Sequence, residues 1–100
     1  VKHPNIVLKQ CLYESAHLKS NIFKSNNNLF GMKFPRQRKT TATKVKNKHA
    51  YYNNWKDSVK DYKIWQNKYY KGGCYYDFIV TSGYCPHNDN YIKTLKQIRL

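Results

Sequence analysis

Apolar residues recur at intervals of three and four along residues 6–24, which is the spacing of one buried face on an α-helix. The positions on this face are Leu8, Cys11, Leu12, Ser15, Leu18, Ile22 and Phe23. Asn5 can cap the first turn with its side-chain oxygen, and three consecutive asparagines at 26–28 favour a turn after the last. The sequence therefore predicts a helix over about residues 6–24.

A second and stronger periodic pattern runs from residue 49 to residue 71. Its apolar stripe comprises Tyr52, Trp55, Val59, Tyr62, Gln66 and Tyr69, and lysines occupy the opposite face. Two glycines follow at 72–73, and glycine commonly ends a helix because it adopts left-handed dihedral angles freely. We predict an amphipathic helix over about residues 49–71.

The large side chains of this second helix divide by their position around its axis. Those on the stripe are expected in the core, and the main ones are Trp55, Val59 and Tyr62. Those off the stripe are expected to be free to meet a partner, and they are Tyr51, Trp65 and Tyr70.

The last third of the chain changes pattern twice. Residues 75–81 are rich in β-branched and aromatic residues and end at Ser82 and Gly83, which predicts one short strand or hairpin. A last helix over about residues 89–99 begins at a cap on Asp89 or Asn90. The predicted fold class is mainly α: one small helical domain of residues 1–100, with helices at about 6–24, 49–71 and 89–99.

Residues 29–48 interrupt the helical pattern with a basic run. Gly31 and Pro35 disfavour a helix here, and no acid occurs between Glu14 and Asp57. The segment has little apolar surface to offset the entropy of ordering it. We expect residues 29–48 to form an extended basic arm that a polyanion orders.

The overall charge supports a polyanionic partner. Nineteen Lys and Arg against five Asp and Glu give a net charge of +14, which attracts nucleic acid, anionic membranes or acidic proteins. On an extended chain, alternate residues lie roughly 6–7 Å apart, close to the spacing of phosphates along a strand, and threonines between the cations can donate to phosphate oxygens. The candidate RNA-binding residues are Lys33, Arg36, Arg38, Lys39, Thr40, Thr41, Lys44, Lys46 and Lys48.

The cysteines leave two states open. Cys11, Cys74 and Cys85 are an odd number, which argues against a complete disulfide framework, but a Cys74–Cys85 bridge and free thiols both fit. Cys85 and His87 are zinc-type ligands, yet ten residues separate Cys74 from Cys85, whereas zinc sites use short gaps. We expect no metal and no cofactor.

No catalytic arrangement is recognisable from spacing. The five acids are scattered, none pairs with a histidine at a known interval, and there is no glycine-rich phosphate loop. The pattern favours a protein that is not an enzyme and has no small-molecule substrate. No apolar run approaches the roughly 20 residues of a membrane span. The chain starts at Val1, which leaves open whether an upstream segment was removed.

These features favour a structural RNA-binding subunit of a ribosome, with rRNA and neighbouring ribosomal proteins as partners. Ribonucleoprotein subunits commonly combine a small globular part with basic extensions that clamp phosphates. Abundant Lys, Asn and Tyr indicate an AT-rich genome, so we expect a mitochondrial ribosome, with a cytoplasmic ribosome as the other location. The alternative function is a small accessory subunit of a mitochondrial respiratory-chain membrane complex.

Overall fold

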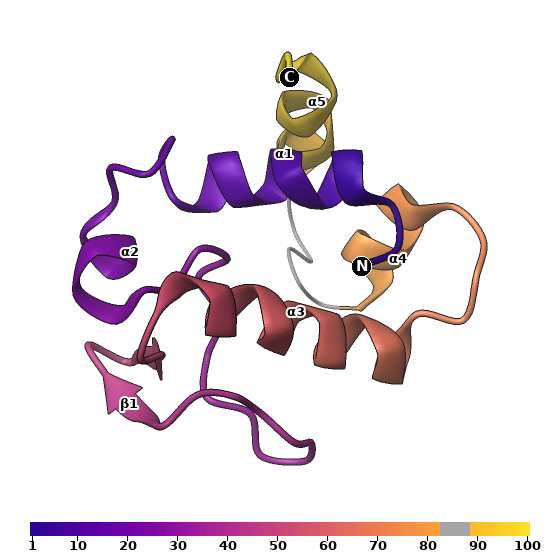
Figure 1. Cartoon of the computed structure of the whole chain (residues 1–100). Coiled ribbons are helices and arrows are strands. Elements are labelled where there is room, and N and C mark those ends of the chain that lie inside the picture. The colour runs from indigo at the N-terminus through magenta and orange to yellow at the C-terminus, as the bar shows by residue number, and fades with distance from the viewer. Residues whose placement is uncertain (83–88) are drawn as a thin grey trace.

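A computed structural model describes residues 1–82 and 89–100, except for the side chain of Asp89 (Figure 1). In chain order its elements are α1 (Pro4–Glu14), α2 (Asn21–Asn26), β1 (Lys44–Lys46), β2 (His49–Tyr51), α3 (Trp55–Tyr69), α4 (Tyr75–Thr81) and α5 (Asp89–Gln97). Helices α1 and α3 cross the molecule in opposite directions, with the β1–β2 hairpin at one end and α4 at the other (Figure 1). The prediction of a mainly α fold is confirmed.

The predicted helix over residues 6–24 is two helices, because the chain turns sharply after α1. Residues 16–18 have φ angles of 49°, 56° and 70°, in the left-handed region that a right-handed helix excludes. Ser20 then caps α2, since its hydroxyl accepts a hydrogen bond of 3.1 Å from the Phe23 amide. The turn leaves Leu18 half exposed and makes Glu14 the last residue of α1.

The predicted helix over residues 49–71 is shorter, because its first residues belong to a hairpin. Val45 pairs with Ala50 in the antiparallel β1–β2 ladder. Between the strands, Asn47 and Lys48 both have positive φ angles, of 53° and 64°, as a tight two-residue turn requires. Asn54 then caps α3, since its side-chain oxygen accepts a hydrogen bond of 3.1 Å from the Asp57 amide.

The predicted strand at residues 75–81 is wrong, since these residues form α4. Tyr75 and Ile79 are four residues apart and both buried, so one helical face contacts the core. Preference for strands depends on the packing context, and here packing against the core outweighs it. The predicted last helix over residues 89–99 is present as α5.

The core is rich in aromatic residues and combines side chains from α1, the segment after α2, α3, α4 and α5, together with Tyr70 after α3. Its members are Val7, Cys11, Leu29, Phe30, Met32, Tyr62, Tyr70, Tyr75, Ile79, Tyr91 and Leu95. Tyr62 is in the core as expected, but Trp55 is 51% exposed. Tyr70, expected on the surface, is buried, and Trp65 packs against the core.

The basic segment 29–48 is anchored at its start by core packing. Leu29, Phe30 and Met32 are buried, whereas residues 33–43 follow them without helix or strand. Asn26 and Asn28 are also buried, and their amides donate to the hairpin: Asn26 to the Lys46 carbonyl at 2.7 Å and Asn28 to that of Ala50 at 2.9 Å. Asn26 and Asn28 therefore hold the start of the segment against the β1–β2 hairpin.

The cysteine predictions fall largely outside the described residues. Cys11 is buried and Cys74 is exposed, but Cys85 and His87 are not described. Among the described residues, no group of three or more His, Cys, Asp or Glu side chains could hold a metal ion. No helix in the described part of the chain is long and apolar enough to cross a membrane.

Candidate functional site

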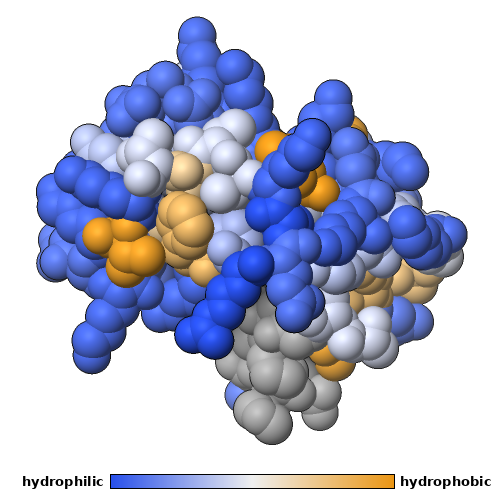
Figure 2. Space-filling view, turned by 90° about the horizontal axis from the view of Figure 1, so that it is seen from below, coloured by the Kyte–Doolittle hydropathy of each residue, from blue (hydrophilic) through white to orange (hydrophobic). Residues whose placement is uncertain are grey.

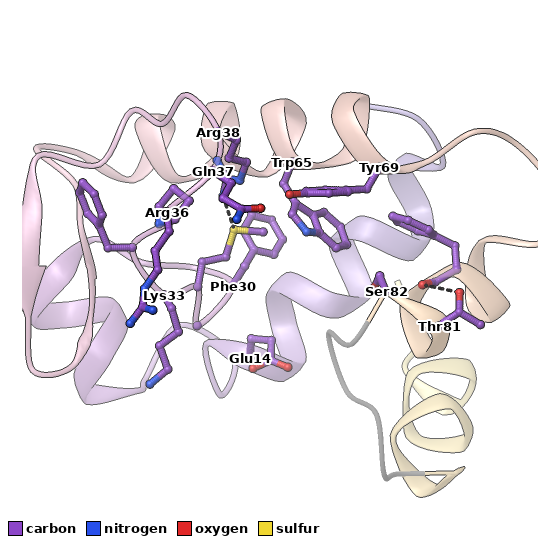
Figure 3. Close-up of a pocket in the computed structure, with 15 residues that line it drawn as sticks. Glu14, Phe30, Lys33, Arg36, Gln37, Arg38, Trp65, Tyr69, Thr81 and Ser82 are labelled. Atoms are coloured by element: carbon purple, nitrogen blue, oxygen red, sulfur yellow. Dashed lines mark hydrogen bonds between the residues drawn. The ribbon is translucent and has the colours of Figure 1, made fainter.

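A pocket of about 810 Å³ opens where α1, α3, α4 and the segment after α2 meet (Figure 3). Its size is that of a site for a small molecule or a few linked sugar or peptide units. Glu14 comes from the end of α1, Trp65 and Tyr69 from α3, and Phe78 and Ser82 from α4 and the residue after it. Residues 30–38 form the remaining side.

Glu14 is the one carboxyl-bearing side chain among the described residues that line this pocket. It is partly buried, and burial raises the pKa of its carboxyl above the ordinary value, because a charged carboxylate loses hydration there. A hydrogen bond from Tyr91 opposes this effect and lowers the pKa in part. The carboxyl thus stays protonated to a higher pH than an exposed glutamate.

The chain approaches Glu14 closely at Gly31. A Cβ atom on this residue would lie 3.2 Å from Glu14 Oε2, and its φ angle is +67°. The positive φ angle favours glycine here, and a Cβ atom would press against the Glu14 carboxylate. Asn28 holds the turn from both sides, since its amide donates to the Met32 carbonyl at 2.9 Å and its oxygen accepts from the Met32 amide at 3.1 Å.

A buried chain of hydrogen bonds ends on Glu14. Tyr91 bonds the Glu14 carboxyl, and its hydroxyl accepts a hydrogen bond of 3.4 Å from Gln10 Nε2. The Gln10 oxygen in turn accepts from the Tyr62 hydroxyl. Tyr91, Gln10 and Tyr62 are all buried, so each link lies in a medium of low dielectric, where hydrogen bonds reinforce one another.

The same chain continues to the N-terminus. Tyr62 and Tyr75 share a hydrogen bond between hydroxyls at 2.6 Å, and Gln66 Nε2 donates to the Tyr75 hydroxyl at 2.9 Å. The Gln66 oxygen accepts from the Lys2 backbone amide at 2.7 Å. With Tyr62 donating to Gln10, the Tyr75 hydroxyl donates to Tyr62. The bonds that link Gln66, Tyr75, Tyr62 and Gln10 therefore all have their donors on the side away from Glu14, while Gln66 Nε2 also donates to the Lys2 carbonyl at 2.7 Å.

Replacing Tyr91 with phenylalanine is expected to raise the pKa of Glu14 further. The substitution removes the hydrogen bond that stabilises the carboxylate and leaves burial as the main influence. The pKa can be measured by NMR titration of the Glu14 side-chain carboxyl carbon. Tyr13→Phe is the matched control, since Tyr13 packs edge-on against the Tyr91 ring at 4.8 Å and is itself 39% exposed. An unchanged pKa in Tyr91→Phe would contradict the assignment.

Aromatic rings form much of the wall opposite Glu14. Trp65 lies 5.1 Å from Phe78 and 6.5 Å from Tyr69 between ring centroids, and all three rings line the pocket. Figure 3 shows Trp65 and Tyr69 on the α3 side, with Ser82 and Thr81 towards α4. Apolar ring faces beside hydroxyl and amide groups suit a ligand that carries both apolar and polar surfaces.

The predicted RNA-binding residues divide between the segment that borders the pocket and the β1–β2 hairpin. Lys33, Arg36 and Arg38 line the pocket, and Lys39 is exposed beside them. Thr40 donates to Asp61 at 2.7 Å, and Thr41 donates to the backbone of α3 at 2.5 Å.

The remaining three predicted residues lie on the hairpin. Lys44 and Lys46 lie over the Tyr51 ring, 4.7 and 5.4 Å from its centroid. Lys48 is exposed, and its carbonyl accepts a hydrogen bond from Lys33 Nζ at 3.1 Å. Several of these side chains thus have contacts within the fold.

Sequence reasoning missed Glu14, Gly31 and Tyr91 as parts of a site. Glu14 is the sole glutamate of the chain, which was the one signal available. Tyr91 is 77 positions further on, and only the packing of α5 against α1 brings it to Glu14.

Comparison with protein families gives one match that spans nearly the whole chain. The family model is Glucosaminidase, described as mannosyl-glycoprotein endo-beta-N-acetylglucosaminidase, and it matches residues 2–99. No curated protein and no solved structure matches the chain.

This match corrects the functional predictions made from the sequence. The expectations of a ribosomal RNA-binding subunit, of a protein that is not an enzyme, and of rRNA and ribosomal proteins as partners with no small-molecule substrate are wrong, since the matching family consists of glycosidases. The alternative of a respiratory-chain subunit fails for the same reason. A high positive charge attracts many polyanions and does not identify a function. Mitochondrial or cytoplasmic location stays a prediction.

Proposed function

Because the chain belongs to the glucosaminidase family, we propose that it is a glycoside hydrolase that cleaves internal β-N-acetylglucosaminyl bonds of a glycan held in the Glu14 pocket. The observation that carries this proposal is the state of Glu14. Its carboxyl lies in a pocket large enough for a short stretch of glycan, and its pKa is raised by burial. Glycosidases need such a carboxylic acid to protonate the leaving oxygen.

Glu14 acts as the general acid. Its proton passes to the glycosidic oxygen as the bond from this oxygen to the anomeric carbon breaks, and the carboxylate that remains is stabilised by the Tyr91 hydrogen bond. Tyr91 therefore favours the charged state that forms during the step, while burial favours the protonated state that starts it.

Three of the chain's other four acids have side chains that the structure describes, and none of these three places a second carboxylate in the pocket. Asp61 is fully buried in an ion pair with Arg38, and Asp77 is exposed on α4. Asp57 belongs to the first turn of α3, and none of these three lines the pocket. The fourth, Asp89, begins α5, and its side chain is not described.

The substrate itself can supply the missing group. An N-acetylglucosamine unit carries an acetamido carbonyl oxygen next to its anomeric carbon, and some glycosidases use this oxygen in place of a carboxylate nucleophile. As Glu14 protonates the leaving oxygen, the carbonyl oxygen bonds the anomeric carbon from the opposite face. Water then opens the resulting ring, returns a proton to Glu14 and restores the starting configuration.

The decisive experiment follows a β-1,4-linked N-acetylglucosamine hexamer by proton NMR during incubation with the protein. We expect new reducing ends from internal cleavage, and the first product to have the β configuration of the substrate. A first product with the α configuration would show that water, activated by a second base, attacks the anomeric carbon directly. The step through the acetamido oxygen would then be wrong. If both the hexamer and a peptide-free bacterial cell-wall glycan stay intact, the proposed function is overturned.

A further inference from the structure

We infer that an apolar groove between α1 and α3 is a docking surface for an anionic lipid bilayer, which the protein contacts through Leu8, Trp55 and the lysines beside them. The groove is distinct from the Glu14 pocket, because Phe30 is the one residue that the described linings of the two share. The inference therefore goes beyond the proposed function and does not depend on it.

The groove has a volume of about 210 Å³. Leu8 comes to it from α1, Trp55 and Val59 come from α3, and the buried Phe30 lines it from the core side. The described residues of this lining are all apolar except for Cys11. Water makes few hydrogen bonds against such a lining, so contact with an apolar group that displaces the water is favourable.

Two large apolar side chains of this groove are open to solvent. Leu8 is 46% exposed and Trp55 is 51% exposed. Single exposed apolar residues are ordinary on a protein surface, but these two belong to the same groove. Leucine and tryptophan are the kinds of side chain that enter the boundary between lipid headgroups and acyl chains, tryptophan because its ring is apolar while its N–H group is polar.

A row of lysines runs along α3 beside the apolar residues of the groove. Lys56 and Lys60 each follow a groove residue, Trp55 and Val59, and they are one helical turn apart. Lys63 lies one turn beyond Val59 on the same helix. The Lys56 ammonium lies over the Trp55 ring, 5.8 Å from its centroid. Apolar side chains edged by lysines are typical of a surface that lies on an anionic membrane.

The charges of two of these lysines are not balanced by an acid. Lys60 pairs with Asp57 at 3.9 Å, whereas no ion pair within the described part of the chain includes Lys56 or Lys63. Both of these side chains are exposed. A lysine can cover apolar surface with its methylene groups while its ammonium reaches outward to a phosphate group. The groove and its edge are thus complementary to acyl chains below anionic headgroups.

A bilayer matches this surface better than an acidic protein does. A stable interface between proteins buries about 800 Å² on each partner around a well-packed centre. The apolar surface here is one small groove with two exposed side chains at it. A bilayer needs no complementary shape, and each lysine near its surface adds to the attraction.

The rest of the surface favours contact with an anionic membrane without deep insertion. On the face seen from below in Figure 1, hydrophilic side chains cover most of the surface and the apolar patches are small (Figure 2). The chain has a net charge of +14, which attracts an anionic bilayer from a distance. The apolar residues of the groove then determine which side of the protein makes the contact.

Sedimentation of the full chain with lipid vesicles tests the inference. One set of vesicles is an equal mixture of phosphatidylcholine and phosphatidylglycerol, and the other is phosphatidylcholine alone. We expect binding to the anionic vesicles to be at least about tenfold tighter at low salt, and this preference to shrink as salt rises. If the protein does not bind the anionic vesicles, the inference is wrong and an acidic protein becomes the better occupant of the groove.

Charge substitutions separate the groove from the charge of the whole protein. Lys56→Gln combined with Lys63→Gln is expected to weaken vesicle binding about 20-fold, since each lysine near an anionic surface contributes roughly fivefold. Lys93→Gln combined with Lys96→Gln is the matched control, because both lysines are exposed on α5, on the far side of α1 from α3 (Figure 1). Lys96 also lies over a ring, that of Tyr76, at 5.0 Å. Equal losses in the two double variants would contradict the inference.

An apolar substitution tests the other half of the surface. Leu8→Ser is expected to weaken vesicle binding about fivefold, because about half of the side chain is exposed before binding and becomes buried in the bilayer. Leu100→Ser is its control, since Leu100 is 61% exposed and does not line the groove. A Leu8→Ser protein that binds as tightly as the unaltered chain would show that the groove stays outside the bilayer.

Tryptophan fluorescence reports the contact without a change in the groove. The chain has two tryptophans, so Trp65→Phe leaves Trp55 as the single indole. We expect its emission to shift to shorter wavelength on anionic vesicles and to be quenched by brominated acyl chains. Emission that stays unshifted in vesicle-bound protein would overturn the inference. None of these measurements contains a glycan, so a chain that inserts Trp55 but cleaves no glycan would retain the docking surface and reject the hydrolase, and the opposite pair of results would do the reverse.

Discussion

Replacing Glu14 with glutamine is expected to lower the rate of glycan cleavage by about 10²- to 10⁴-fold, the usual contribution of a positioned general acid. Glutamine has the same shape but cannot donate an acidic proton to the glycosidic oxygen. Binding should persist, because the substitution leaves the size of the side chain beside Gly31 unchanged. The measurement is the initial rate of reducing-end release, with substrate affinity determined separately by calorimetry.

The Glu14 carboxyl also determines how the rate of glycan cleavage depends on pH. A general acid works in its protonated form, so the rate should fall as the pH rises through the pKa of Glu14, which burial raises above the ordinary value. In Tyr91→Phe this fall should move to higher pH. The carboxyl of Asp77 is the matched control, since it is exposed on α4 and does not line the pocket. If Asp77→Asn lost as much activity as Glu14→Gln, the assignment of the acid would be wrong.

The helical character of the fold could be predicted because spacing alone carries it. The apolar periodicity of residues 55–69 corresponds to α3, and that of residues 89–97 to α5. The break after α1 could not be predicted, because residues 16–18 have positive φ angles without a glycine among them. The residues of α4 have strand-like composition, and only the burial of Tyr75 and Ile79 against the core determines their helical form.

The site could not be predicted, because tertiary contacts assemble it. The three asparagines at 26–28 suggested no more than a helix end, yet Asn28 holds the turn that brings Gly31 against Glu14. The basic run after them suggested a free arm for a polyanion. In the structure, Arg38 from this run is paired with the buried Asp61 on α3. The two residues are 23 positions apart in the sequence, so no local pattern reveals the pairing.

Replacing Asp61 with asparagine is expected to lower the free energy of unfolding by about 3–5 kcal/mol, because it leaves the buried Arg38 cation without a counter-charge. The Asp61 side chain is fully buried, and that of Arg38 is 6% exposed. Both carboxylate oxygens accept hydrogen bonds: Oδ1 from Arg38 and Thr40, and Oδ2 from Arg38 and Tyr52. An asparagine amide group would place a donor against donors on one of these sides.

Chemical denaturation with urea measures this loss, and Lys60→Gln is its control. Lys60 forms the other described ion pair, with Asp57 at 3.9 Å, but its side chain is 70% exposed, so its removal should change the free energy of unfolding by less than about 1 kcal/mol. Arg38→Gln combined with Asp61→Asn should be more stable than the sum of the two single losses predicts, because no unpaired charge remains buried. Strictly additive losses would show that the pair is not coupled.

The Asp61→Asn substitution should also affect the pocket, apart from its effect on stability. Arg38 and Thr40 attach the segment 33–43 to α3 through Asp61, and this segment has no helix or strand of its own. When the attachment is lost, the wall that contains Lys33 and Arg36 is free to move, although Glu14 stays in place on α1. At a temperature where Asp61→Asn is still folded, we therefore expect KM for the β-1,4-linked N-acetylglucosamine hexamer to rise more than kcat falls. An unchanged KM would mean that the wall keeps its position without the ion pair.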